Sequence, residues 1–318
     1  MNDQPNPEAI RNVFVIINPA AGQDRPILGT LNRVFNANGV NWEVGITKQG
    51  GDATQMAHEA VLAGADVVAV NGGDGTVMEA ASGLCGSDTP LAIIPGGSAN
   101  VMSIELGIPN DTEQAVSLIC DPMHQIRTID MGRVHDSGEN EHMFLLRLSL
   151  GYFARMTEGT ARESKNRMGA LAYAFSALSV LPQAEMVHFD ITVDGEGYET
   201  EGVTCIIANS GAMGLPGLKF SRTVSVDDGL LDLVVMQNAD LLEVAKVLSN
   251  SLSGVENLPH WQGREITVHA DPIQPIECDG EMIEPTPVRA SIVPQSLRII
   301  VPNSTSIEAL TQEIMQRG

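Results

Sequence analysis

The sequence predicts two fold types in succession: an N-terminal α/β domain with a parallel sheet, and an all-β domain that is most simply a β-sandwich. Short apolar runs alternate with amphipathic helical stretches until about residue 130, and strand patterns dominate after residue 135. The chain has 318 residues, more than one average domain needs. We therefore expect the α/β domain at 1–134, the β-sandwich at 135–303 and a C-terminal helix at 304–318.

The strands of the first domain are predicted by short apolar, mostly β-branched runs. Val13–Ile17 is fully apolar, which is typical of a parallel strand buried on both faces. The helix that follows places Ile27, Leu31 and Val34 on one face and ends near Gly39, a suitable C-cap. The alternation continues with strands at Asn41–Thr47, Asp66–Asn71 and Leu91–Ile94 and helices around 53–61, 77–84, 99–106 and 112–119.

The second domain is predicted by a series of strands separated by turn signals. Two tight hairpins are indicated by Asp194-Gly195 and Asp279-Gly280. Helical insertions are expected at Thr160–Val180 and Asp240–Ser253, and an amphipathic helix at Ser304–Arg317. The expected strands are Met143–Leu150, Met186–Val193, Gly202–Ala208, Leu230–Met236, Glu265–Ala270, Val288–Val293 and Leu297–Val301.

The balance of charge excludes one class of partner. The chain has 18 Lys and Arg against 40 Asp and Glu, for a net charge of −22. Proteins that bind nucleic acid through its phosphates need clustered basic residues, so we expect no nucleic-acid partner. An anionic ligand must therefore be held by a local site that overcomes the overall repulsion.

Cysteine spacing and the absence of long apolar runs indicate the compartment. The four cysteines are far apart and form no CxxC pair, so neither a zinc site nor a disulfide framework is indicated. The N-terminus has no apolar signal segment, and apolar runs of about five residues are far shorter than the ~20 that span a bilayer. We expect a soluble, cytoplasmic protein.

Three loops of small residues follow three of the predicted parallel strands. They are Asn18–Gly22, Asn71–Thr76 and Pro95–Asn100, and the second opens directly onto a helix. Backbone N–H groups in glycine loops and at helix N-termini bind phosphate, and open α/β sheets bind ligands at this edge. Any one loop could be a plain turn, but the three together predict a nucleotide or phosphate site. Asp74 would be costly beside phosphates unless it binds Mg²⁺ or accepts hydrogen bonds from a ribose or water.

Four motifs together resemble the diacylglycerol kinase catalytic family, with the soluble bacterial lipid kinases and sphingosine-kinase relatives closest in layout. They are NPAAG at 18–22, NGGDGTV at 71–77, IPGGSAN at 94–100 and DDGLLD at 227–232, and the resemblance covers nearly the whole chain. It implies ATP bound in the cleft between the two domains, and a C-terminal helix that returns to the first domain. It also implies ATP- and Mg²⁺-dependent transfer of the γ-phosphoryl group to a hydroxyl of a diacylglycerol-like or sphingoid lipid.

The resemblance assigns roles to individual residues. It makes Asp74 a catalytic as well as an ATP-binding residue, and Ser98 keeps the hydroxyl of the family's usual threonine. For Mg²⁺ it implies the Asp228 carboxylate with the backbone carbonyls of Ser225 and Leu230; without the resemblance, this Asp-Gly pair would be a plain turn. The ATP-binding residues that it implies are Asn18, Thr47, Gly72, Gly73, Asp74, Gly75, Thr76 and Ser98.

The catalytic base could come from either of two Asp-Gly-Glu triplets, at 194–196 and 279–281. Both predict hairpin turns, and spacing alone does not choose between them. In the family the base is the glutamate of the triplet that follows the DGLLD strand, which selects Glu281 over Glu196. Its role would be to accept the proton of the attacking lipid hydroxyl.

Two positions depart from the family pattern. Val101 stands where many relatives carry an aspartate, and Gln23 and Asp24 stand where a lysine is frequent. Two alternatives therefore stay open: a soluble-substrate kinase of the NAD kinase type, and a nucleotide- or lipid-binding regulator with weak activity. The lipid partner would be met at the inner membrane face, with the basic and apolar stretch Met156–Val180 as the surface element or as an ordinary packed helix. A homodimer is also compatible with the sequence.

Overall fold

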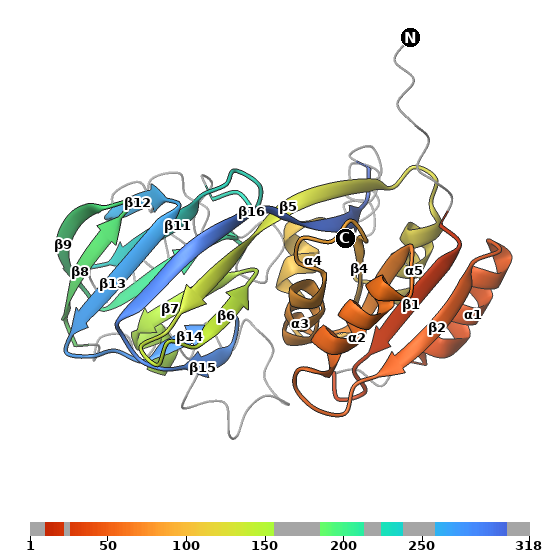
Figure 1. Ribbon diagram of the computed structural model, residues 1–318, viewed down its shortest axis with the longest axis horizontal. Helices are drawn as coiled ribbons and strands as arrows, with labels where there is room; N and C mark the ends of the chain where they lie inside the picture. Colours follow the sequence, from red (N-terminus) through yellow and green to blue (C-terminus); the bar gives the residue numbers. More distant parts are fainter. Residues whose placement is uncertain (1–9, 22–25, 156–184, 213–223, 238–257, 304–318) are drawn as a thin grey trace, which may run out of the picture. The chain divides into compact units, whose positions relative to one another are not determined.

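The computed structural model describes residues 10–21, 26–155, 185–212, 224–237 and 258–303 (Figure 1). The chain forms two compact units, the first reaching Thr128 and resuming at Leu297, the second spanning Ile129–Ser296. It passes between the units inside two strands, β5 (Gln125–His135) and β16 (Val288–Val301). The domain boundaries expected at 134 and 303 stay predictions. The helices expected at 160–180, 240–253 and 304–317 lie outside the described residues, as do Gln23 and Asp24.

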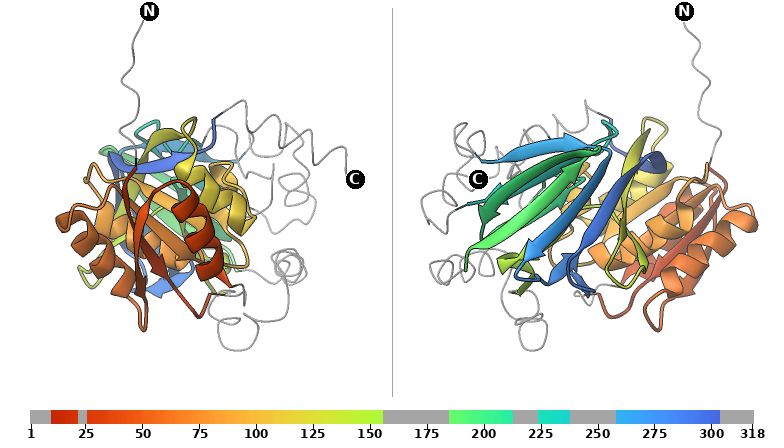
Figure 2. Two further views of the ribbon diagram at one scale, coloured as in Figure 1. Left: turned by 90° about the vertical axis from the view of Figure 1, so that its right-hand side faces the viewer. Right: turned by 60° about the vertical axis from the view of Figure 1, so that its left-hand side comes forward.

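The first unit is a parallel sheet with helices on both faces. Its strand order is β2-β1-β3-β4-β16, and each neighbouring pair is parallel. Helix α2 packs with α3 and α1 with α5, and Figure 2 shows the two pairs on opposite sides of the sheet. The elements are β1 (Asn12–Ile17), β2 (Asn41–Ile46), β3 (Val67–Gly72), β4 (Leu91–Pro95), α1 (Ile27–Ala37), α2 (Asp52–Leu62), α3 (Asp74–Leu84), α4 (Val101–Glu105) and α5 (Thr112–Cys120).

The strand order creates a switch point between β1 and β3. From β1 the chain runs through α1 to β2 on one side, whereas from β3 it runs through α3 to β4 on the other (Figure 1). The loops that leave the carboxyl ends of β1 and β3 therefore turn away from each other. Open α/β sheets bind ligands in the crevice that this divergence leaves.

The second unit is an antiparallel β-sandwich. One sheet contains β16, β13, β8 and β9 with β5 and β6, and the other has the order β12-β11-β10-β7-β14-β15. Apolar side chains from both sheets, among them Phe144, Phe189, Leu148 and Leu233, form one buried core. The predicted fold class is thus confirmed for both parts. The remaining strands are β6 (Glu141–Phe144), β7 (Arg147–Gly151), β8 (Val187–Val193), β9 (Glu196–Gly202), β10 (Thr204–Ala208), β11 (Leu231–Met236), β12 (His260–Gly263), β13 (Glu265–Asp271), β14 (Ile276–Cys278) and β15 (Glu281–Ile283).

One predicted strand is interrupted. The sequence predicts a single strand over Met143–Leu150, but β6 ends at Phe144 and β7 begins at Arg147. The backbone N–H groups of the intervening residues do not pair with a strand, because they donate to the carboxylate of Asp279. A side chain more than 130 residues away thus breaks a continuous apolar run.

None of the described helices has the length and apolarity that crossing a bilayer requires.

Candidate functional site

Asn18 connects the two loops at the switch point. Its backbone N–H donates to the carbonyl of Asn71 at 2.9 Å, which extends the β1–β3 pairing by one residue. Its side-chain Nδ2 donates to Oγ1 of Thr76 at 2.8 Å, and its Oδ1 accepts the backbone N–H of Ala20 at 2.9 Å. One asparagine therefore sets both the turn after β1 and the first turn of α3.

The glycine loops after β3 and β4 touch each other through their backbones. The N–H of Gly96 donates to the carbonyl of Gly72 at 2.9 Å. A Cβ atom on Gly97 would lie 2.6 Å from the Cα of Gly73, and one on Gly72 would lie 2.6 Å from the Cβ of Thr76. Glycine is required at these positions because larger residues would clash with the neighbouring atoms. The contact between the two loops joins them into one surface, which is the candidate phosphate-binding site.

Replacing Gly97 with alanine should therefore separate the two loops. The clash is with backbone, which cannot rotate away, so we expect the free energy of unfolding to fall by about 1–3 kcal/mol and ATP affinity to fall with it. Urea unfolding and calorimetry with a non-hydrolysable ATP analogue measure both. Gly75→Ala is the control for stability, because a Cβ there meets no atom within 4 Å. Equal stability of the two variants would contradict this account of the loop contact.

Asp74 begins α3 and faces the start of a second helix. Its Oδ1 accepts the backbone N–H of Met102, in the first turn of α4, at 3.4 Å. Burial raises the pKa of Asp74, and backbone N–H groups of Met102, Val101, Asp74 itself and Asn100 partly oppose this. The carboxylate thus lies where the N-terminal ends of two helices meet, which favours negative charge. Val101 is buried and brings no second acid to this place.

Ser98 and Thr47 occupy different environments. Ser98 is exposed, in a loop that Asn100 closes by accepting the N–H of Gly97 at 2.9 Å and donating to its carbonyl at 3.0 Å. Asn100 is buried and has a left-handed backbone with φ of 49°, so this loop has a fixed shape. Thr47 is buried at the end of β2, where its N–H donates to the carbonyl of Ile17 at 3.0 Å.

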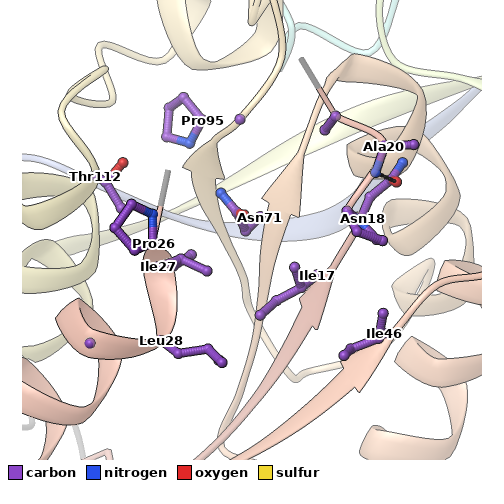
Figure 3. A pocket seen from close by; sticks show the side chains of 14 residues that line it. Ile17, Asn18, Ala20, Pro26, Ile27, Leu28, Ile46, Asn71, Pro95 and Thr112 are labelled. Atoms are coloured by element: carbon purple, nitrogen blue, oxygen red, sulfur yellow. Dashed lines mark hydrogen bonds between the residues drawn. The ribbon is translucent and has the colours of Figure 1, made fainter. Parts of the chain in front are cut away.

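A pocket of about 530 Å³ lies at the carboxyl edge of the sheet (Figure 3). Asn18 lines it, but Thr47, Ser98 and the loop Gly72–Thr76 do not. The pocket is mainly apolar, and two of the exposed apolar side chains of the protein, Leu28 and Ile46, form part of its wall. The other lining residues are Ile17, Pro19, Ala20, Ala21, Pro26, Ile27, Gly29, Asn71, Pro95, Gly96 and Thr112.

In the second unit, Asp279 fixes the hairpin that carries Glu281. The turn between β14 and β15 has left-handed φ at Asp279 (47°) and Gly280 (96°), as the Asp-Gly pair predicts. The Asp279 carboxylate accepts the backbone N–H groups of Leu145, Leu146 and Arg147 at 2.7 to 3.2 Å. Burial raises its pKa to about 6, although these hydrogen bonds lower it.

Glu281 and Glu196 occupy equivalent turns but differ in their surroundings. Both are exposed and both begin the second strand of an Asp-Gly hairpin. The carboxylate of Glu196 accepts the hydroxyl of Tyr198 at 2.8 Å, whereas no described residue donates a hydrogen bond to that of Glu281. Glu281 is on β15, in the same sheet as β11, the strand that follows the loop of Asp228. Glu196 is on β9, in the other sheet. These differences favour Glu281 as a proton acceptor.

The buried carboxylate of Asp279 should make stability depend on pH. Its folded-state pKa of about 6 exceeds the ordinary 3.8, so between these values the folded protein keeps a proton that the unfolded chain has released. The resulting stabilisation, about 3 kcal/mol, is complete below about pH 4 and is lost as the pH rises through about 6. Urea unfolding from pH 4 to 7 should show this component in the wild type and not in Asp279→Asn. Asp194→Asn, in the matched turn, should keep the wild-type slope; an unchanged slope in Asp279→Asn would contradict the assignment.

The residues proposed to bind metal lie in the loop before β11. Asp228 is exposed, and its Oδ1 accepts the backbone N–H of Leu230 at 3.0 Å. Partial burial raises the pKa of Asp228, this hydrogen bond lowers it, and the charges of Asp232, Asp130 and Asp227 raise it again. Negative charge is therefore concentrated around this loop.

The hydrogen bonds of Asp232 indicate whether a divalent cation fits at the loop of Asp228. Its side chain is fully buried, and its Oδ1 accepts hydrogen bonds from His260 at 2.6 Å and Gln262 at 2.9 Å. Its Oδ2 has no hydrogen-bond partner among the described residues, which is costly unless a cation or donor is near. The surplus charge and all-oxygen donors fit Mg²⁺, with Asp228, Ser225 and Leu230 as the candidate ligands.

Two polar residues of the second unit, Asp279 and Asn209, were not identified from the sequence. Asp279 is the first member of the Asp-Gly-Glu triplet at 279–281, whose sequence pattern points to the glutamate alone as a candidate base. Asn209 is completely buried; its Nδ2 donates to the carbonyls of Asp130 at 3.1 Å and Leu145 at 2.9 Å. Its Oδ1 has no partner among the described residues. A polar residue directly after the fully apolar end of β10 was the available signal.

Comparison with known protein families finds two matches along the chain. Residues 12–134 match the family described as diacylglycerol kinase catalytic domain. Residues 147–301 match the family described as YegS C-terminal NAD kinase beta sandwich-like domain. Both structural parts therefore have counterparts in one group of proteins.

Individual relatives extend over most of the chain. An uncharacterized protein of Synechocystis sp. is 31% identical, covering 92% of this chain and 70% of that protein. A diacylglycerol kinase of Bacillus subtilis is 27% identical, covering 86% of this chain and 90% of its own length. The crystal structure of a diacylglycerol kinase from Bacillus anthracis superimposes with a TM-score of 0.76 at 27% identity, covering 94% of this chain and 99% of that one.

Proposed function

Because the chain belongs to the diacylglycerol kinase catalytic domain family, whose members are lipid kinases, we propose that it phosphorylates a lipid hydroxyl with the γ-phosphoryl group of ATP. The lipid is diacylglycerol-like or sphingoid, and the reaction uses Mg²⁺. The observation that carries this proposal is the convergence of Asn18 and the two touching glycine loops at the switch point of the sheet.

The first unit would bind ATP. The backbone N–H groups of Gly73, Gly75 and Thr76, at the start of α3, would hold phosphate oxygens, because a helix N-terminus has a positive dipole end. The hydroxyl of Ser98 is exposed and available to the same phosphates. Thr47 would contact the nucleotide at the end of β2, and the glycine at Gly72 leaves room for the Thr76 side chain that Asn18 holds.

Mg²⁺, when bound, would neutralise the charge that builds up on the phosphoryl group during transfer. Asp74 would interact with it through its carboxylate, whose pKa burial raises and the backbone N–H groups at the start of α3 and α4 partly lower. A second, structural Mg²⁺ site is proposed at Asp228 with the carbonyls of Ser225 and Leu230. The Oδ2 of Asp232, which has no hydrogen-bond partner within the described ranges, supports a cation at that place.

Glu281 would accept the proton of the lipid hydroxyl as its oxygen attacks the γ-phosphorus. Three features of the second unit support this role. The carboxylate of Glu281 is exposed, no described residue donates a hydrogen bond to it, and Asp279 fixes the hairpin that carries it. A general base has to be positioned and unoccupied before its pKa matters. Glu281 is exposed and accepts no hydrogen bond from a described residue, which supports this role.

The lipid would be met at a membrane surface, through peripheral contact at the inner face. The net charge of −22 opposes approach to an anionic bilayer, so the contact would depend on local basic groups. A homodimer is compatible with this proposal and is not required by it.

The proposed function is tested by incubating the protein with Mg²⁺, labelled ATP and a total lipid extract, and identifying the labelled product. A phosphorylated diacylglycerol or sphingoid base is the expected product. Transfer to NAD with no transfer to lipid would instead show a soluble-substrate kinase. Binding of ATP without transfer to any lipid would instead show a regulator. This is the alternative that Val101 leaves open, because many relatives carry an aspartate at that position. Either of the last two outcomes would overturn the proposal.

A further inference from the structure

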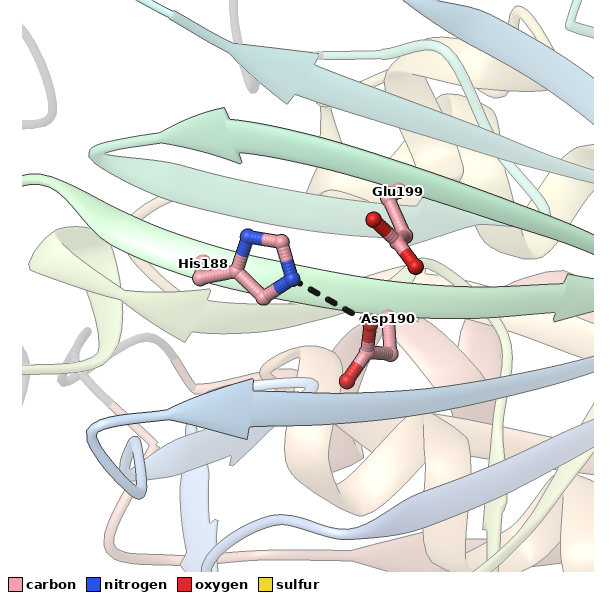
Figure 4. Close-up of side chains that lie close together, drawn as sticks. All are labelled: His188, Asp190 and Glu199. Atoms are coloured by element: carbon pink, nitrogen blue, oxygen red, sulfur yellow. Dashed lines mark hydrogen bonds and ion pairs between the residues drawn. The ribbon is translucent and has the colours of Figure 1, made fainter.

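The outer face of the sandwich carries a cluster of one histidine and two acidic side chains that has no role in the function proposed above. His188 and Asp190 are two residues apart on β8, and Glu199 is the direct partner of Asp190 on β9. Each offers one ligand atom, and these atoms all lie within 4.8 Å of one another. Figure 4 shows the imidazole and the two carboxylates directed toward a common point. From this geometry we propose that His188, Asp190 and Glu199 form a site for a divalent transition-metal ion of the Zn²⁺ type.

The strand pattern explains why these side chains gather. Along β8 the residues alternate between buried and accessible, so His188 and Asp190 both point away from the core. The same alternation on β13 places His269 outward, directly across from Asp190. Side chains of directly paired residues begin about 4.5–5.5 Å apart, so His269 can reach the site by rotating. After such a rotation His269 would supply a fourth ligand, the number that a tetrahedral site needs.

The local charge is unbalanced without a cation. Glu201 on β9 and Asp271 on β13 are the direct partners of His188 on either side. Asp190 and Glu199 add two more carboxylates, and like charges directly opposite on neighbouring strands destabilise a sheet. Within the described part of the chain, the ion pair that these groups form is that of His188 with Asp190, at 3.2 Å. A bound divalent cation relieves this repulsion.

The donor atoms decide the class of metal. An imidazole nitrogen with carboxylate oxygens suits Zn²⁺ and its first-row neighbours, whereas Mg²⁺ and Ca²⁺ prefer oxygen alone. This site therefore differs in selectivity from the all-oxygen loop at Asp228. Bound metal would join three strands of one sheet, β8, β9 and β13, and so stabilise the second unit.

The test is calorimetric titration of the metal-free full chain with Zn²⁺, with excess Mg²⁺ present to fill oxygen-only sites. One equivalent of Zn²⁺ is expected to bind, and His188→Ala and Glu199→Gln should each weaken it at least about tenfold. Zn²⁺ should also raise the melting temperature of the wild type but not of His188→Ala. The matched control is His58→Ala, an exposed histidine on α2 of the other unit, which should bind as the wild type does.

Three results would overturn the proposal: no Zn²⁺ binding, equal binding by the wild type and His188→Ala, or loss of binding in His142→Ala instead. The last variant tests another pair of histidine and acid, in which His142 faces Asp136 at 3.1 Å. Because His188 is partly exposed, the melting temperature of the metal-free variant should match that of the wild type, which shows that it folds. Neither readout depends on kinase activity, so the result is separate from the proposed function.

Discussion

Replacing Glu281 with alanine is expected to lower the rate of lipid phosphorylation by about 10²–10⁴-fold, the usual contribution of a general base. The loss should appear in kcat, because the proton is transferred in the chemical step. ATP affinity, measured by calorimetry, should be unchanged, since Glu281 belongs to the second unit and the ATP-binding loops to the first. Its side chain is exposed, so stability should be unchanged as well.

Glu196→Ala is the matched control for this experiment. Glu196 follows an Asp-Gly turn of the same geometry, with left-handed φ at Asp194 and Gly195, and begins a strand in the same way. Among the described residues the substitution removes one hydrogen bond, that from Tyr198, so the activity of Glu196→Ala should stay within about twofold of the wild type. If instead Glu196→Ala loses turnover while Glu281→Ala keeps it, the assignment of the base is wrong.

The second large effect is expected at Asp74. The change to asparagine keeps an oxygen that can accept the N–H of Met102 but removes the charge. We expect phosphoryl transfer to fall by about 10²-fold or more, as for the loss of one electrostatic group in an active site. Thermal stability should hold or rise slightly, because burial disfavours the charged form and raises the pKa of Asp74. Asp74→Ala should lose both activity and stability.

A control is available at the other end of the same parallel strands, where Asp66 directly precedes β3. Asp66 accepts the backbone N–H groups of Arg11 and Asn12, both at 2.8 Å, and so anchors backbone as Asp74 does. Asp66→Asn should therefore leave transfer unchanged, with kcat measured over a Mg²⁺ titration for both variants. Full activity of Asp74→Asn would show that Asp74 only anchors α4.

The sequence predicted the parts of the fold whose causes are local. The apolar run at Val13–Ile17 and the glycines at 72–75 carry their structural meaning within a few residues, and both lie where expected. The roles of the site residues were implied by a family resemblance and remain proposals. Even so, spacing could not separate Glu196 from Glu281, whose turns are equivalent. The structure adds a physical difference between them, the hydroxyl of Tyr198.

What sequence could not supply are interactions between distant segments. The carboxylate of Asp279 interrupts the strand expected over Met143–Leu150, and its partners are 132 to 134 residues away. The buried, half-satisfied Asp232 is similar, since its partner His260 lies 28 residues further along. No periodic pattern records such contacts, because each depends on which strands become neighbours.

The shared strand β16 has a consequence for how the protein is made. The parallel sheet of the first unit gains its last strand from residues 297–301, which leave the ribosome after all of the second unit. Until then β4 is an open edge, and open edges invite pairing with other chains. A nascent chain stalled before residue 297 should therefore be prone to aggregate. Maturation of the first unit thus waits until residues 297–301 have been synthesised.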